Sequence, residues 1–177
     1  LGAIMLGNEP ALKKYMDEKP RRRDENIVSK KMMAQIITMG AWLTFISFLF
    51  LKLPLFETWF KTMPNKLTET GAGATELLTG YFVLFIVSAL FNGFNVRDEK
   101  FKIFSGLNEN KGFLKVFFAI IIVQAIIVNA ALIPGLGFIG EMFSCVPIGI
   151  ECWGILILLA FTMIPIDLIR KCFVKNN

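Results

Sequence analysis

The stretch MMAQIITMGAWLTFISFLFL, residues 32–51, contains twenty residues and no charged side chain. A transmembrane helix needs about 20 predominantly apolar residues to cross the hydrocarbon core of a bilayer. Two further uncharged runs of at least this length follow, and a fourth, Cys152–Ile166, has 15 residues. The fourth run reaches spanning length if Glu151 and Asp167 lie at the two membrane interfaces. The sequence therefore predicts an all-α polytopic membrane helix bundle with four transmembrane helices, at about 32–51, 77–96, 116–133 and 150–167.

The composition agrees with a chain that is surrounded by lipid. Hydrophobic residues make up 55% of the 177 residues, whereas soluble domains contain about 45–50% by a looser count. The net charge is +5, and the basic residues lie between the apolar runs. An anionic membrane surface is therefore the expected partner, and no nucleic acid is expected. The chain has no histidine, which removes the commonest general base and metal ligand.

The basic residues outside the four runs predict the orientation of the chain. Before, between and after the runs they number 8, 3, 5, 0 and 3 in chain order. Short cytoplasmic loops are enriched in Lys and Arg. The alternation of high and low values predicts that the N- and C-termini are both cytoplasmic. We expect two domains: residues 1–31, with the end of a preceding helix and a basic cytoplasmic loop, and residues 32–177, with the four spans.

Catalytic and metal-ligating patterns are missing from the sequence. There is no nucleophile–base pair, phosphate-binding loop or cluster of metal ligands, so we predict no catalytic residue and no metal site. The glycines of 135–140 formally match a dinucleotide-binding fingerprint, but they follow a membrane helix rather than a strand. Cys145 and Cys152 share one exterior loop, where they could form a disulfide or remain two unlinked thiols.

Four polar side chains lie inside the predicted spans. Asn92 and Asn95 are three residues apart and share a helix face, and Gln124 and Asn129 lie in the third run. Polar groups are costly in lipid and usually face protein or water. The asparagines are candidates either for an ion path or for hydrogen bonds that fix helix packing.

The most distinctive segment precedes the first span. A short apolar stretch ends at Glu9-Pro10, and a second proline precedes a run of three arginines, in the order Glu9, Pro10, Lys19, Pro20, Arg21, Arg22, Arg23. By charge alone this segment would lie against anionic headgroups, at about 1 kcal/mol for each basic residue.

This segment resembles the loop after the sixth transmembrane helix of P-type cation-transporting ATPases, the calcium pumps especially. The matching positions, in order and spacing, are Ala3, Leu6-Gly7, Glu9-Pro10, Met16, Lys19-Pro20, Arg23 and Ile27-Val28. The resemblance extends to the end of the chain. Its later elements are Phe91-Asn92-Gly93-Phe94-Asn95-Val96-Arg97, Phe104 with 108–113, and Ile133-Pro134-Gly135 with Trp153.

The resemblance implies that the spans are helices seven to ten of a ten-helix pump. The fragment would brace the ion-binding helices, and Glu9–Arg23 would couple them to the cytoplasmic domains of the same pump. No cofactor is expected in the fragment; ATP, Mg²⁺ and transported Ca²⁺ are implied for the full-length translocase, in a plasma or bacterial inner membrane. Ala89 occupies the place of an ion ligand of two-calcium pumps, and alanine cannot coordinate a cation, which favours a single-ion pump.

A different class of protein also fits the residues. A non-enzymatic four-span scaffold or accessory subunit would have the same spans, with the polar exterior loop Thr68–Thr79 as a site for its partner.

Overall fold

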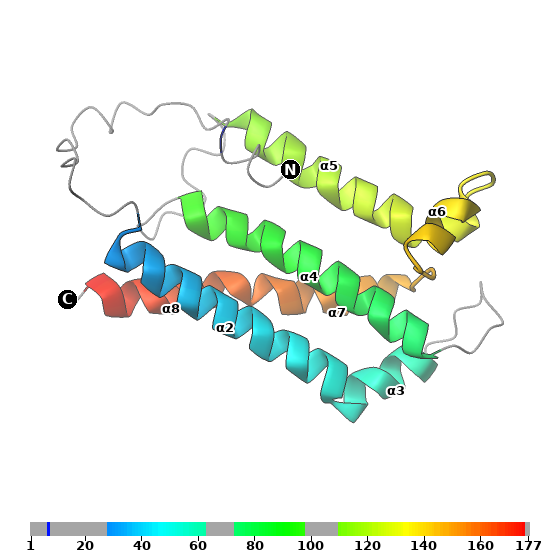
Figure 1. Ribbon diagram of the computed structural model, residues 1–177, viewed down its shortest axis with the longest axis horizontal. Coiled ribbons are helices and arrows are strands. Elements are labelled where there is room, and N and C mark those ends of the chain that lie inside the picture. The colour runs from blue at the N-terminus through cyan, green and yellow to red at the C-terminus, as the bar shows by residue number, and fades with distance from the viewer. Residues whose placement is uncertain (1–6, 8–27, 63–72, 98–109, 176–177) are drawn as a thin grey trace.

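The computed structural model describes residues 7, 28–62, 73–97 and 110–175. Four long helical segments run along a common axis, and successive segments run in opposite directions (Figure 1). Each of the four is long and apolar enough to cross a membrane. The predicted all-α bundle with four candidate spans is thereby confirmed. Because the directions alternate, the start of the first segment and the end of the last lie at the same end of the bundle.

Helix α2 (Lys30–Lys52) is the first span. Its first turn is capped by Ser29, whose hydroxyl accepts a hydrogen bond from the Met32 amide at 3.2 Å, which satisfies one of the free N–H groups at a helix start. The helix ends at Leu53, whose backbone is extended, as is usual before a proline. Pro54 then opens the short helix α3 (Pro54–Thr62), which turns back toward the bundle (Figure 1).

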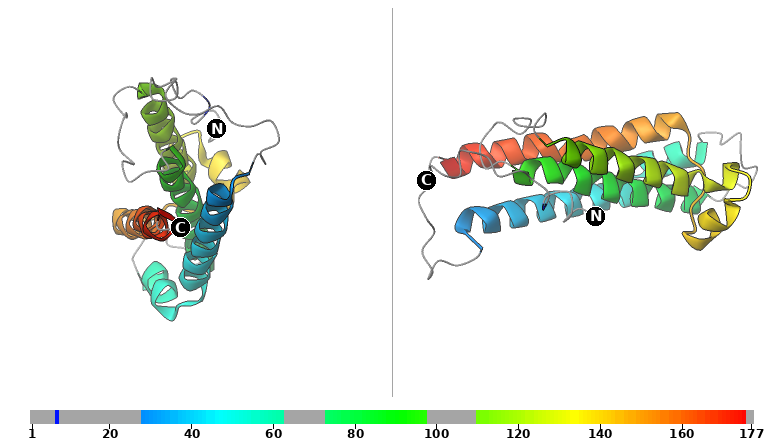
Figure 2. Two further views of the ribbon diagram at one scale, coloured as in Figure 1. Left: turned by 90° about the vertical axis from the view of Figure 1, so that its left-hand side faces the viewer. Right: turned by 90° about the horizontal axis from the view of Figure 1, so that it is seen from above.

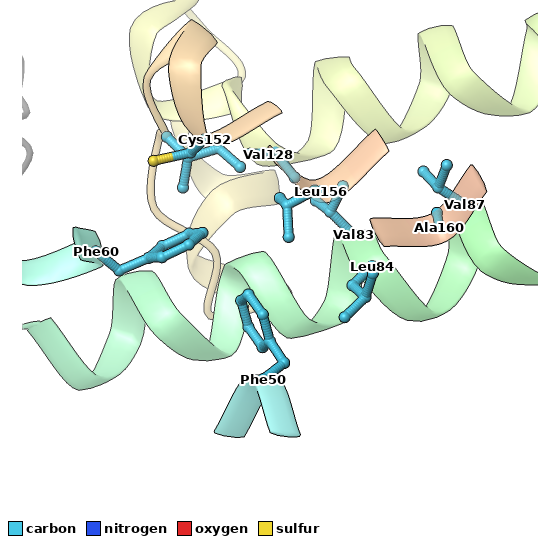
Figure 3. Packing of buried hydrophobic residues seen from close by; sticks show 10 residues of the cluster. Phe50, Phe60, Val83, Leu84, Val87, Val128, Cys152, Leu156 and Ala160 are labelled. Carbon is cyan, nitrogen blue, oxygen red and sulfur yellow. The ribbon is translucent and has the colours of Figure 1, made fainter. Parts of the chain in front are cut away.

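Helix α4 (Gly73–Arg97) is the centre of the bundle. Seen end-on, α2, α5 and the last segment surround it (Figure 2). The largest apolar cluster forms along it, and Figure 3 shows Phe50 from α2 and Phe60 from α3 pointing toward α4. Both rings pack over Gly80, where a Cβ atom would lie 2.6 Å from Phe60 Cε1 and 3.1 Å from Phe50 Cζ. Only glycine therefore permits this close approach.

Helix α5 (Lys111–Val128) begins where the Asn110 side chain accepts a hydrogen bond from the Phe113 amide at 2.8 Å. It starts before the expected residue 116 and ends before the expected 133. The reason is a break at Asn129, after which the chain forms a single 3₁₀ turn, η2 (Ala130–Leu132). A turn with Gly135 at φ +85° and the short helix α6 (Gly137–Met142) lead to the last segment.

The last segment is two helices, α7 (Ile150–Phe161) and α8 (Met163–Lys175), which together form one candidate span, Ile150–Phe173. The break at Thr162 lies one turn from Pro165, which has no N–H to donate and so interrupts the helical hydrogen bonds. The span continues past Asp167, and this side chain is fully buried. The expectation that Asp167 lies at a membrane interface stays a prediction, because its burial against charged partners on its own helix does not give its depth in a bilayer.

Candidate functional site: a buried polar junction

Asn95, near the end of α4, is held by the last helix through both its side chain and its backbone. Its side-chain Nδ2 donates a hydrogen bond to the carbonyl oxygen of Met163 at 2.9 Å. Its own carbonyl oxygen accepts one from Lys171 Nζ at 3.3 Å. Asn95 is 1% exposed, so neither bond competes with solvent. Two contacts eight residues apart on α8 thus attach one residue of α4 to two turns of that helix.

Asp167 lies between these two contacts and carries the buried negative charge. Its Oδ1 is 2.8 Å from Arg170 Nε, and its Oδ2 is 2.8 Å from Lys171 Nζ. The side chains of all three residues are buried or nearly so. An unpaired charge would be strongly unfavourable in this environment. The pairing keeps Lys171 in position to donate to α4.

The same region is joined to α2 through the break in the last span. Trp42 Nε1 on α2 donates to Thr162 Oγ1 at 3.0 Å, and Thr162 Oγ1 donates to the Leu159 carbonyl oxygen at 2.6 Å. The hydroxyl at the break therefore serves as acceptor for one span and donor within its own. We refer to Trp42, Asn95, Thr162, Asp167, Arg170 and Lys171 as the polar junction. It joins α2, α4 and α7–α8.

The chemistry of the polar junction is that of helix-to-helix attachment. In the described ranges, no group of three or more Cys, Asp or Glu side chains could hold a metal ion. Most donors of the junction are used within the bundle, whereas the buried Asn95 Oδ1 accepts no hydrogen bond from the described residues. The arrangement can fix the relative positions of three spans.

The candidates from the sequence fall in different surroundings. Asn95 lies in the polar junction, whereas Asn92 is half-buried with its Oδ1 enclosed and not hydrogen-bonded among the described residues. Asn129 donates to Ala125 within its own chain segment at 2.9 Å. Gln124 is 3% exposed, and its Nε2 has no hydrogen-bond partner in the described part of the chain. The predicted coupling residues from Glu9 to Arg23 lie outside the described residues.

Sequence reasoning missed Trp42, Thr162 and the charged residues at the end of the last span as a site. One usable signal was present: Asp167, Arg170 and Lys171 are spaced by three and four residues, the spacing at which opposite charges meet on a helix. The partner on α4 left no comparable signal, because a backbone carbonyl accepts that hydrogen bond.

The two cysteines of the predicted exterior loop are both free thiols. Cys145 Sγ donates weakly to the Phe143 carbonyl oxygen at 3.5 Å. Burial raises the pKa of the Cys145 thiol, and a hydrogen bond with Thr79 partly offsets that increase. The unlinked alternative is therefore the one found. The same loop is attached to α4 by a hydrogen bond from the Val146 amide to Thr79 Oγ1 at 3.2 Å.

On the side of α4 away from the core, a row of side chains is exposed: Leu78, Phe85, Ala89 and Val96. The successive spacings of seven, four and seven residues place them on one face of a helix. Ala89, the position that the resemblance places at an ion ligand, belongs to this row. The core residues Val83, Leu84 and Val87 occupy the other side. We call the exposed row the open face of α4.

Fold and site together define a class of protein. Four apolar helices of spanning length, joined by polar groups buried between them, are typical of a multi-pass integral membrane protein. Residues 1–173 match the family described as "Cation transporting ATPase, C-terminus". The chain belongs to this family.

Comparison with individual proteins identifies plasma-membrane-type calcium-transporting ATPases as relatives. The chain is 27% identical over 183 residues to the rice "Probable calcium-transporting ATPase 6, plasma membrane-type", which covers 100% of this chain and 16% of that protein. It is 26% identical over 155 residues to the rabbit "Plasma membrane calcium-transporting ATPase 1", with 86% of this chain and 12% of that protein covered. The human protein of that name gives 27% over the same length. No solved structure matches significantly.

Proposed function

We propose that this chain is the C-terminal membrane domain of an ATP-driven calcium pump. Its role would be to brace the ion-binding helices. The chain spans only 12–16% of the length of these relatives, so the transported ion, ATP and Mg²⁺ belong to the full-length protein. The proposal is supported by the family match and by the names of the relatives.

The observation that carries the bracing role is the contrast between the two sides of α4. On one side the polar junction and the core hold α4 against α2 and α7–α8. On the other side the open face includes a small residue, Ala89, that is exposed. A rigid helix with a free face of this kind suits the packing of further helices. Ala89 itself offers no side-chain ligand to a cation.

The experiment compares Ala89→Trp with Ala119→Trp in the intact protein that carries this chain. Both alanines are exposed in the fragment, on α4 and α5 respectively. We expect Ala89→Trp to lower ATP-dependent calcium uptake into vesicles at least about tenfold, since displacements of about 1 Å can cost two orders of magnitude in rate. Ala119→Trp should change uptake little, because that side of α5 would face lipid. Equal uptake by the two variants would refute the bracing role.

A second part of the proposal concerns the segment from Glu9 to Arg23. We infer from its density of charge beside a helix end that it pairs with the cytoplasmic domains of the same pump and couples them to the spans. Reversal of Arg21, Arg22 and Arg23 to Glu should lower the calcium transported per ATP hydrolysed. An unchanged ratio would remove this part of the proposal and leave the bracing role standing.

The charges of the described helices support a cytoplasmic location of the α8 end and, with it, of both termini. The helix ends at that end of the bundle carry Lys30, Lys31, Arg97, Lys111, Lys115, Arg170 and Lys171. The opposite ends carry Lys52 with Glu57, Glu76 and Glu151. By the enrichment of basic residues in cytoplasmic loops, we propose a plasma or bacterial inner membrane with the α8 end inside. Protease accessibility of a C-terminal tag in oriented vesicles tests this orientation.

A further inference from the structure

Helix α3 separates its apolar and polar side chains. At 100° per residue, Leu55, Phe56, Trp59 and Phe60 occupy one continuous arc of the helix, whereas Glu57 and Thr58 lie outside it. A nine-residue helix of this kind is too short to cross a bilayer. Its apolar arc must therefore be covered by the bundle or by something else.

Among the described residues, the bundle covers half of the arc. Phe60 is 2% exposed and packs over Gly80 on α4. The ring of Phe56 lies 5.2 Å from that of Phe50 on α2. The other half consists of Leu55 and Trp59, which are 51% and 39% exposed. Since Phe60 and Phe56 fix the rotation of α3, the side on which Leu55 and Trp59 project is also fixed.

The uncovered half adjoins an exposed apolar surface at the end of α2. Helix α3 follows α2 directly in the chain, and the end of α2 carries two exposed apolar residues, Phe48 and Leu53. Lys52 occupies the last position of that span. With α2 as a span, Lys52 would mark its end at the headgroups, and the exposed side chains of α3 would lie at that level. Figure 1 shows α3 at the end of the bundle rather than along its length.

The size and chemistry of the uncovered half favour lipid as its occupant. A stable protein interface buries about 800 Å² on each partner and about 20–30 residues a side, and two side chains cannot supply this. Tryptophan is enriched at the membrane interface, where its ring is buried and its N–H reaches polar groups. Short amphipathic helices bind there through apolar residues of this kind.

We propose that α3 is an interfacial anchor, with Leu55 and Trp59 inserted among the headgroups and upper acyl chains of the leaflet at the C-terminal end of α2. The phospholipid interface is the partner. Because α3 is packed on α4 through Phe60 and Gly80, the anchor holds the depth of both helices at once. The inference requires only that the spans cross a bilayer, so it is independent of the transported ion.

The experiment measures the depth of Trp59 by fluorescence. The intact protein is reconstituted in phosphatidylcholine vesicles whose lipids are brominated either near the headgroup or near the chain end. Subtracting the emission of Trp59→Phe from that of the wild type isolates the Trp59 signal. We expect headgroup-proximal bromine to quench this signal several-fold more strongly than chain-end bromine. Trp153→Phe is the matched control, because Trp153 packs against the core of the bundle and its signal should be quenched less by either lipid.

Two outcomes would overturn the proposal. Quenching of the Trp59 signal by aqueous iodide and by neither lipid would place this side chain in water. Protection from iodide and from both brominated lipids would mean that protein covers Trp59. Since Trp59→Phe keeps an aromatic ring at this position, the variant should fold, and comparison of its thermal stability with that of the wild type verifies this.

Discussion

Helices α4 and α5 both have the length and apolar character of a membrane span, but they occupy different environments. Half of the span residues of α4 are buried inside the molecule, against 22% for α5. The more buried helix is the less apolar one, with Ser88 and Asn95 fully enclosed. In a membrane, lipid is as good a solvent for apolar side chains as the protein interior is. For this pair of helices, apolar character alone therefore does not identify the central one.

The attachment of the two helices differs in kind. Close packing over Gly80 and the polar junction hold α4. Between α4, α5 and the last span lies an apolar cavity of about 210 Å³, bordered on the α5 side by Phe117 and Ile121. A set of edge-to-face ring contacts joins α5 to α4, with Phe94 5.0 Å from Phe117. The same type of substitution should therefore cost much more on α4 or its partners than on α5.

The largest difference is expected when the polar junction loses a charge. Lys171→Met leaves Asp167 without one of its two cations and Asn95 without a donor. Removing one partner of a buried ion pair costs about 3–5 kcal/mol, and we expect the lower end because Arg170 remains. The free energy of unfolding in mixed detergent micelles measures the effect.

The matched control for this variant is Lys115→Met, since Lys115 on α5 is exposed. It should change stability by less than about 1 kcal/mol. The variant Asp167→Leu should cost at least as much as Lys171→Met, because it leaves Arg170 and Lys171 without the carboxylate that both contact. Equal effects of the two single lysine variants would contradict a structural role for the polar junction.

A smaller difference is expected for added volume. Gly80→Val places a side chain where Phe60 and Phe50 leave no room for a Cβ atom, and overpacking of this kind costs about 1–3 kcal/mol. Gly112→Val on α5 would bring its Cβ no closer than 3.4 Å to Asn110 Oδ1. The midpoint of thermal unfolding in detergent should fall clearly for Gly80→Val alone. A similar loss at both positions would show that the close approach of α3 to α4 is not a special contact.

The smallest effect, with opposite signs on the two helices, is expected for the buried amides. Gln124→Met removes an Nε2 donor that has no partner among the described residues, so stability should be unchanged or rise by up to about 1 kcal/mol. Asn95→Leu removes a hydrogen bond that is made and should cost about 1 kcal/mol. Chemical unfolding of both variants side by side decides the matter. A loss on Gln124→Met as large as that on Asn95→Leu would mean that the α5 amide also holds the bundle together.

The number and character of the spans could be predicted from the sequence because uncharged runs of spanning length follow directly from the thickness of a bilayer. The helix cap at Ser29 could also be predicted from the sequence, because it depends only on residues next to it in the chain. The arrangement of the spans could not be predicted in this way. The residues around Gly80 in the sequence do not indicate which aromatic rings from other helices pack on it. Asp167 illustrates the limit: the sequence shows an acidic residue at the end of an apolar run, but it does not show that the bundle encloses this side chain. Its burial depends on two basic residues and on a carbonyl group of another helix.

The spacing of the charges in α8 has a consequence for the biosynthesis of the protein. Asp167 finds both of its cations three and four residues further along the same helix. These pairs form as soon as the helix does, whichever other span has already entered the bilayer. The cost of bringing a carboxylate into the membrane is therefore met within a single helix, and the last span can be inserted before its neighbours are in place. The polar contacts between spans remain for assembly, among them the hydrogen bond from Lys171 to the Asn95 carbonyl oxygen, which attaches the last span to α4.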